Sequence, residues 1–277
     1  ITSRDAVNIV QRRLRKVKVG HAGTLDPLAE GVLVIALGPA SRLVPYVQQQ
    51  PKDYRATFRF GESSVSGDLE GEIARHPELP KPNRADVDSA AKLLVGRIQQ
   101  TPPTHSAIWV DGKRAYKRIR AGETFEMPKR TVEVYSIQVL RYEYPEIELD
   151  ISCGSGTYIR SIGIDLAKSC GTNAVMSFLC RHRVGSFGVD GSTSVENLRT
   201  KDLESIIIDP NVAVEHLDQI VVDRTQCTRL GHGLALQGTK PTAKQSEAAA
   251  ITTSGALRAI VREKRGEWFP YRVFPTD

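Results

Sequence analysis

Residues 20–31 read GHAGTLDPLAEG and place the carboxylate of Asp26 in a turn that contains three glycines. Glycine frees the backbone from ordinary steric limits, which suits a loop that closes around a ligand. Because Pro27 follows, Asp26 is biased away from helix and toward an extended or turn conformation. The apolar run at residues 32–37 comes next and predicts a buried strand. The pattern indicates either a structural Asp-Pro turn before a strand or a loop that presents a functional carboxylate.

The charge of the chain is concentrated in segments. The 277 residues are 40% hydrophobic and 25% charged, as in an ordinary globular protein, and the formal net charge is +6. Residues 1–20 carry six Lys and Arg against one acid, and residues 111–130 carry seven against three, whereas residues 62–78 are acidic. Each cluster alone could be a solvated face. Two basic clusters on either side of the Asp26 loop in sequence indicate a surface that meets a polyanion.

The cysteines and the absent motifs exclude several classes of protein. Cys153, Cys170, Cys180 and Cys227 form no CxxC pair, which argues against a zinc ribbon or a disulfide framework and fits reduced thiols in the cytoplasm. No apolar run reaches the roughly 18 residues of a membrane span. We find no metal-ligand cluster, phosphate-binding loop or dinucleotide motif, and therefore expect neither a metal nor a cofactor.

Hydrophobic spacing predicts a mixed fold. Helical spacing covers residues 4–18, 40–49 and 84–97 and a segment that ends at Cys170, and alternation predicts strands at 54–60, 131–140 and 147–153. Without a regular βαβ rhythm, this predicts an α+β fold with a mixed, largely antiparallel central sheet and flanking helices.

Two segments differ from this core. Residues 99–130 open with two prolines and contain an Asp-Gly hairpin signal, so we expect an insertion that stands off the sheet. From about residue 206, short strands alternate with glycine turns, as in a small β-rich module. We therefore expect a catalytic domain at residues 1–205 and a small module at 206–277.

Asp26 is a candidate nucleophile or general base, because a carboxylate can form covalent intermediates. Burial would raise its pKa, and an arginine partner would reverse that effect and hold both oxygens. Arg160 follows a glycine-rich turn at residues 154–156, but the spacing alone does not single it out among 38 Lys and Arg.

Four blocks, at residues 20–31, 52–55, 156–160 and 178–185, occur in the order found in the TruB family of tRNA pseudouridine synthases, which the chain resembles over roughly residues 1–190. The segment at 102–130 is similar to the RNA-clamping loop of that family. The C-terminal module is loosely similar to its small PUA-like domain.

The resemblance implies roles for individual residues. Asp26 would attack the target uridine and Arg160 would pair with it, while Tyr54 would stack on the flipped base. Tyr158 and Leu179 would line the pocket. The alternatives are structural: the two tyrosines could be core aromatics on strand faces, and Leu179 an ordinary core residue of a helix.

Further residues would contact the RNA. His21 would reach into the folded RNA, unless it is an ordinary loop histidine. The expected RNA-binding side chains are those of Lys113, Arg114, Arg130 and Arg181. The chain departs from the family pattern where Glu30 replaces a common threonine. The Lys-Pro-Gly segment that precedes Thr2 in the family is also missing, and we expect it to lie upstream of Ile1.

The resemblance implies an enzyme that flips the uridine at position 55 of the tRNA T loop and isomerises it to pseudouridine. We expect a monomer with tRNA as its partner. A non-catalytic protein that binds or folds tRNA would use the same basic surfaces. A glycoside hydrolase with Asp26 and Glu30 as its carboxylate pair is the weakest alternative, because the chain has only two tryptophans to form a sugar platform.

Overall fold

The computed structural model describes residues 1–103, 109–110, 112–114, 118, 123, 125, 127–241 and 246–275, with only the backbone for 109–110 and 113–114. The chain forms two compact units. The first comprises Ile1–Thr24, Leu33–Gln48 and Thr193–Asp277, and the second comprises Leu25–Val32 and Gln49–Ser192.

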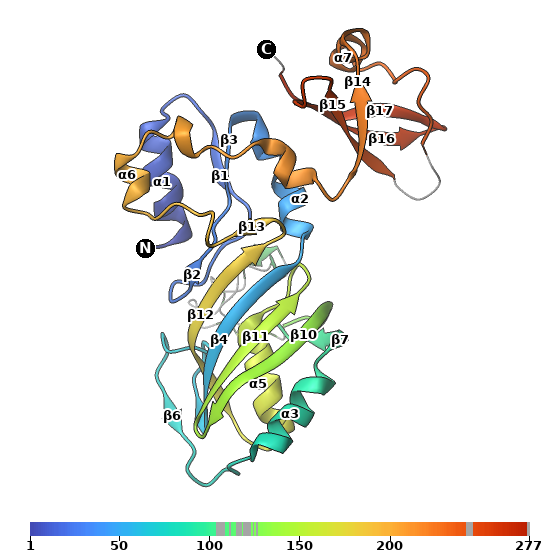
Figure 1. Ribbon diagram of the computed structural model, residues 1–277. Helices are drawn as coiled ribbons and strands as arrows, with labels where there is room; N and C mark the ends of the chain where they lie inside the picture. The colour runs from blue at the N-terminus through green and yellow to red at the C-terminus, as the bar shows by residue number, and fades with distance from the viewer. Residues whose placement is uncertain are drawn as a thin grey trace. The chain divides into compact units, whose positions relative to one another are not determined.

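The second unit is built on a seven-stranded sheet with the order β13-β12-β4-β11-β10-β7, and β2 pairs with β12 (Figure 1). Every pairing is antiparallel except that of β2 with β12. The strands are β2 (Glu30–Gly31), β4 (Lys52–Phe60), β7 (Gly96–Gln100), β10 (Arg130–Glu143), β11 (Glu146–Cys153), β12 (Ala174–Val184) and β13 (Phe187–Gly188).

Strand β4 shows why the sheet has one apolar face. Its even-numbered residues from Tyr54 to Phe60 are buried, whereas Arg55 on the opposite face is exposed. Two helices, α3 (Arg84–Leu93) and α5 (Ile159–Ser169), cover the apolar face (Figure 1). Helix α5 approaches β4 closely at Gly163, where a Cβ atom would lie 2.0 Å from Cε1 of Phe58. The amphipathic strand and the glycine together fix the height of α5 above the sheet.

Two small hairpins complete the second unit. Strands β5 (Glu62–Ser63) and β6 (Ala74–Arg75) pair at the ends of the acidic loop. Strands β8 (Trp109–Val110) and β9 (Lys113–Arg114) pair antiparallel with Val110 opposite Lys113, which agrees with the hairpin signal in the sequence. Most of the expected RNA-clamping insertion lies outside the described residues.

The first unit begins with α1 (Ser3–Arg13), in which Thr2 and Asp5 form a capping box. The short strands β1 (Val19–His21) and β3 (Ile35–Leu37) pair with each other. The other short elements of this unit are η1 (Gly38–Leu43), α2 (Val44–Gln49), α6 (Asn197–Thr200), η2 (Glu204–Ile206) and η3 (Pro210–Val214).

The C-terminal part of the first unit has its own sheet and core. Strands β14 (Asp218–Val222), β15 (Glu247–Thr252), β16 (Leu257–Lys264) and β17 (Glu267–Val273) form a four-stranded sheet in sequence order. Helix α7 (Arg224–Gly231) contributes Leu230 to a core that also includes Trp268. The predicted fold class is confirmed: α+β, with a largely antiparallel central sheet, flanking helices and a small β-rich C-terminal module.

Several predicted boundaries are wrong. Helix 84–97 ends at Leu93, because Gly96 adopts a φ of +101° and opens strand β7. The helix expected to Lys18 ends at Arg13, where the Gln11 side chain donates to the carbonyls of Leu14 and Val17. The buried strand expected at residues 32–37 is reduced to β3. No helix in the described parts of the chain is long and apolar enough to cross a membrane.

Candidate active site

The Asp26 loop ends in a tight turn that is packed on the core of the second unit. The amide of Ala29 donates to the carbonyl of Asp26 at 2.9 Å, which closes a turn with Pro27 at its second position. Proline suits that position because its ring fixes φ near −65°. Leu28 and Ala29 pack against the hydrophobic core, and β2 then pairs with β12. These contacts fix the loop while the Asp26 side chain keeps 32% of its surface exposed.

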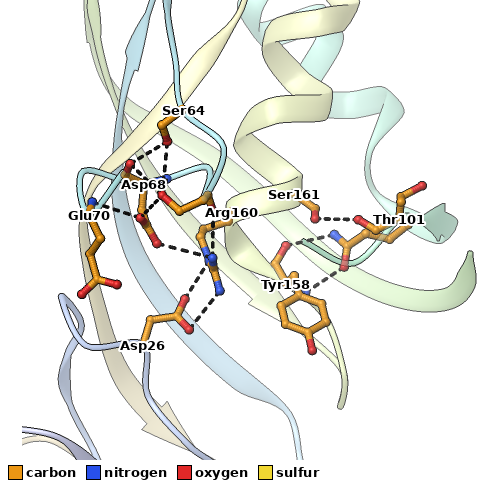
Figure 2. A network of polar contacts seen from close by, with 10 residues as sticks. Asp26, Ser64, Asp68, Glu70, Thr101, Tyr158, Arg160 and Ser161 are labelled. Atoms are coloured by element: carbon orange, nitrogen blue, oxygen red, sulfur yellow. Dashed lines mark hydrogen bonds and ion pairs between the residues drawn. The ribbon is translucent and has the colours of Figure 1, made fainter. Parts of the chain in front are cut away.

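Arg160 lies in the first turn of α5 and holds both oxygens of Asp26. Its Nε lies 2.9 Å from Oδ2 of Asp26, and its Nη2 donates to Oδ1 at 3.1 Å (Figure 2). The Arg160 side chain is only 4% exposed, and a buried charge of this kind requires partners. Such a two-pronged pair fixes the direction of the carboxylate as well as its charge.

A second carboxylate, that of Asp68, holds Arg160 from the other side. Oδ2 of Asp68 lies 3.4 Å from Nη1 of Arg160, which also donates to the carbonyl of Ser66 at 2.8 Å. Asp68 is 2% exposed, and its Oδ1 accepts from the Ser66 hydroxyl at 2.6 Å and from the Glu70 amide at 3.1 Å (Figure 2). The sequence gives no sign of this role for Asp68, because Asp68 is one of several acidic residues in a loop with the composition of a solvated segment.

Three charges meet at this point, and they set the pKa of Asp26. Burial, the largest effect, raises this pKa above its usual 3.8, and the nearby carboxylate of Asp68 raises it further. The Arg160 guanidinium opposes both, through its charge and its hydrogen bond. Asp26 is therefore a partly desolvated carboxylate with a raised pKa, and the Arg160 guanidinium limits that rise by favouring the ionised form.

The expected pocket residues lie on the strands beside this ion pair. Tyr54 on β4 is 8% exposed, and Leu179 on β12 is 5% exposed; both belong to the core cluster against which Leu28 packs. Leu179 thus lies in a strand, not in a helix. Burial raises the pKa of Tyr54 to about 12, and the charge of Asp26 contributes to this rise.

Tyr158 precedes α5 and is anchored through its backbone. Its amide donates to Oε1 of Gln100 at 2.7 Å, and its carbonyl accepts from Nε2 of Gln100 at 2.9 Å. The hydroxyl of Ser161 donates to the carbonyl of Thr101 at 2.9 Å, so the start of α5 is tied to β7 and to the residue after it (Figure 2). Gln100 is fully buried, and its type gave no signal in the sequence.

The expected RNA contacts have different surroundings. The Arg130 guanidinium lies 4.6 Å from the centroid of the Tyr158 ring, a cation–π contact. Arg181 is 3% exposed, which differs from the surface position that an RNA contact requires. The side chains of Lys113 and Arg114 lie outside the described residues. His21 lies partly buried in β1 of the first unit, and its reach into the RNA stays a prediction.

Other chemistry has less support in the described residues. Glu30 is exposed in β2, and its pairing with Asp26 as a glycosidase acid is not favoured by the Asp26–Arg160–Asp68 arrangement. Across the described ranges, no group of three or more His, Cys, Asp or Glu side chains is placed to hold a metal ion.

Comparison with known proteins identifies the family. Residues 11–159 match the family described as TruB family pseudouridylate synthase (N terminal domain). The tRNA pseudouridine synthase B of Rhodopirellula baltica is 41% identical over 319 residues, covering 99% of this chain and 92% of that protein. The Brucella anthropi protein of the same name is 35% identical over 300 residues, with the same coverage of both chains.

A solved structure shows the same fold at low identity. A chain of a Cbf5-Nop10-Gar1 complex superposes with a TM-score of 0.74 at 24% identity, covering 99% of this chain and 81% of that one. At this identity the likeness supports the fold alone. The family match and the full-length relatives, together with the paired Asp26 and Arg160, show that the chain belongs to the TruB family of pseudouridylate synthases.

Proposed function

We propose that this chain isomerises a uridine of the tRNA T loop, at position 55, to pseudouridine, with Asp26 as the catalytic carboxylate. The observation that carries the proposal is the two-pronged ion pair between Asp26 and the buried Arg160. The pair orients one carboxylate and favours its ionised form, and the Asp26 side chain is still 32% exposed. The relatives matched over 99% of this chain are named tRNA pseudouridine synthase B, which supports tRNA as the substrate.

The uridine must leave its stack before this carboxylate can reach it. Extruding a base costs a few kcal/mol, and stacking on an aromatic ring recovers about 1–3 kcal/mol. We assign this stacking to Tyr54, because the charge of Asp26 contributes to the raised pKa of this tyrosine and its ring packs in the same core cluster as Leu179. Leu179 and Tyr158 then form the apolar walls of the pocket.

The reaction is an isomerisation that balances without a redox step. The N1–C1′ bond of the uridine breaks with the assistance of Asp26, and the detached uracil turns. A new bond joins C5 to C1′, the proton of C5 is lost to a base, and N1, which carries no proton in uridine, gains one. Arg160 holds the Asp26 oxygens toward the reacting sugar and base throughout, which lowers the cost of orienting them in the transition state.

The basic segments bind the RNA backbone. Residues 12–18 of the first unit carry Arg12, Arg13, Arg15, Lys16 and Lys18, all exposed. Phosphate contacts of this kind make affinity fall steeply with salt. We propose a monomer that acts in the cytoplasm on the T-stem loop, gripped by this segment and by the insertion at residues 99–130.

The test is tritium release from tRNA labelled at C5 of uridine, with Asp26→Asn as the variant and Asp88→Asn on α3 as the matched control. We expect release by the parent and the control, and none by Asp26→Asn, with tRNA affinity retained by all three. Retained release by Asp26→Asn contradicts the catalytic role. Tight tRNA binding without release by the parent instead favours a protein that folds tRNA.

A further inference from the structure

Arg181 is a buried arginine at the junction of three strands. It lies on β12 with Tyr54 of β4 as its register partner on one side and Gly31 of β2 on the other. It is 3% exposed. A guanidinium has five N–H donors and no acceptor, so an arginine buried to this extent is held by what those donors reach.

One group that Arg181 reaches belongs to the segment that follows Asp26. Its Nε donates to the carbonyl of Val32 at 2.9 Å, and the Val32 amide donates back to the Arg181 carbonyl at 2.7 Å. Gly31 makes this approach possible, because a Cβ atom there would lie 2.3 Å from the Arg181 carbonyl oxygen. Its φ of +102° also favours glycine. The end of the Asp26 loop is therefore held against β12 by both the backbone and the side chain of Arg181.

The other group is the side chain of Tyr54, the register partner of Arg181 on β4, and the Arg181 side chain lowers the pKa of Tyr54 through its charge and through a hydrogen bond to the hydroxyl. Arginine can only donate, so the Tyr54 oxygen accepts and its own proton is directed elsewhere. The guanidinium charge also opposes the rise that burial causes in the pKa of Tyr54. One side chain thus contacts both the aromatic ring proposed to stack on the base and the segment that carries the catalytic carboxylate.

We propose that Arg181 is a positioning residue for the isomerisation, which holds the Tyr54 hydroxyl and the Val32 carbonyl in one arrangement so that ring and carboxylate keep a fixed geometry. The proposal rests on the proposed function. It replaces the expectation that Arg181 binds RNA phosphate, because the guanidinium is directed into the protein.

A double-mutant cycle between Arg181 and Tyr54 tests this role. The variants are Arg181→Gln, Tyr54→Phe and the double variant, with Arg181→Lys as a conservative replacement in case the glutamine does not fold. Arg183→Gln is the matched control, since Arg183 lies two residues along the same strand with its side chain 54% exposed. The readouts are the single-turnover rate of tritium release at saturating tRNA, the tRNA affinity at two salt concentrations, and the free energy of unfolding.

We expect Arg181→Gln to lower the single-turnover rate at least about ten-fold with tRNA affinity within two-fold of the parent. In the Tyr54→Phe background, Arg181→Gln should lower the single-turnover rate by a factor about five-fold smaller, because the hydroxyl that Arg181 positions is already absent. Arg181→Lys should recover part of the rate, and Arg183→Gln should leave it unchanged. A purely structural role would lower the free energy of unfolding without this coupling to Tyr54.

Two results overturn the proposal while the parent is active. If the rate loss of the double variant equals the product of the losses of Arg181→Gln and Tyr54→Phe, Arg181 does not act through Tyr54. If Arg181→Gln weakens tRNA binding and reduces its salt dependence at an unchanged saturated rate, the residue is a phosphate contact. Absence of release by the parent would instead contradict the proposed function, and this inference would fall with it.

Discussion

Arg160 contacts both carboxylate oxygens of Asp26, although the two residues are 134 positions apart in the chain. Arg160 is held in turn by the Asp68 carboxylate and the Ser66 carbonyl, so its guanidinium cannot rotate away from Asp26 without breaking buried hydrogen bonds. Asp26 is the one member of the Asp26–Arg160–Asp68 set with appreciable exposure. The arrangement is a rigid buried support for one accessible carboxylate.

Replacing Arg160 with lysine should retain the charge but lose the two-pronged geometry. We expect Arg160→Lys to lower the single-turnover rate about 100-fold, the scale of a small misplacement of a catalytic group. The hydrogen bond that lowers the pKa of Asp26 is weakened, so this pKa rises. Because Asp26 must be ionised to act, the acid limb of the pH–rate profile should move to higher pH.

The control for this prediction is Arg59→Lys on β4. Arg59 is also paired with a carboxylate, that of Glu146, but its side chain is 42% exposed. It should leave both rate and pH profile unchanged. An Arg160→Lys enzyme with the parent pH–rate profile would show that Arg160 does not set the ionisation of Asp26.

Neutralising Asp68 should move the same profile in the opposite direction. The Asp68 carboxylate raises the pKa of Asp26, so Asp68→Asn removes a negative charge and lowers that pKa. We expect the acid limb to move to lower pH, while the plateau rate falls because Arg160 loses an anchor on Nη1. The measurement is the single-turnover rate from pH 4 to 8, with Glu72→Gln on the same acidic loop as control. An acid limb that moves upward would contradict this assignment of charges.

The sequence was sufficient for the local features of this site and insufficient for its long-range contacts. The alternation at residues 54–60 predicted β4 and hence the face on which Tyr54 lies, and the Asp-Pro turn at Asp26 is present. The role of Asp68 could not be predicted, because it depends on the buried guanidinium of Arg160 on α5, which is far from Asp68 in the sequence. Arg181 reads as a surface cation until the pairing of β2, β4 and β12 shows it to be enclosed.

The same limit applies to helix α5. A glycine inside a helix costs about 1 kcal/mol relative to alanine, so Gly163 looks like a defect in the sequence. In the structure its missing side chain leaves room for Phe58, which is fully buried. Close packing between helix and sheet is a tertiary property that local spacing does not encode.

Gly163→Ala therefore should destabilise the protein, although alanine favours helix. A Cβ atom 2.0 Å from the Phe58 ring must displace the helix or the ring, and such overpacking costs about 1–3 kcal/mol or more. Urea unfolding should show this loss, and Phe58→Leu in the same chain should recover part of it. Gly188→Ala, with nothing within 4 Å of the added atom, is the control. A more stable Gly163→Ala variant would contradict the packing described.

Lys52, the first residue of β4, should make stability depend on alkaline pH. Its side chain is buried beside Cys153 and Arg181, and burial lowers its pKa from 10.5 to about 8. In the unfolded chain the lysine keeps its proton to about pH 10.5. Between these values the unfolded state binds more protons than the native state, so stability rises with pH. Below pH 8 the buried charge exists in the native state, and its full cost is present.

Lys52→Met retains the volume of the side chain and removes the charge. We expect its gain in unfolding free energy over the parent to be larger at pH 7 than at pH 9.5, by about 2 kcal/mol at 1.36 kcal/mol per pH unit. Lys52→Met also loses the hydrogen bond from Lys52 Nζ to the Gln50 carbonyl at both pH values, and the part of that bond that depends on the charge is already contained in the native pKa. Urea unfolding of both proteins at pH 7 and pH 9.5 measures the difference between the two gains, and Lys92→Met at an exposed position on α3 is the control. Equal effects at both pH values would mean that Lys52 stays protonated in the native protein, because only a proton lost on folding makes the gain depend on pH.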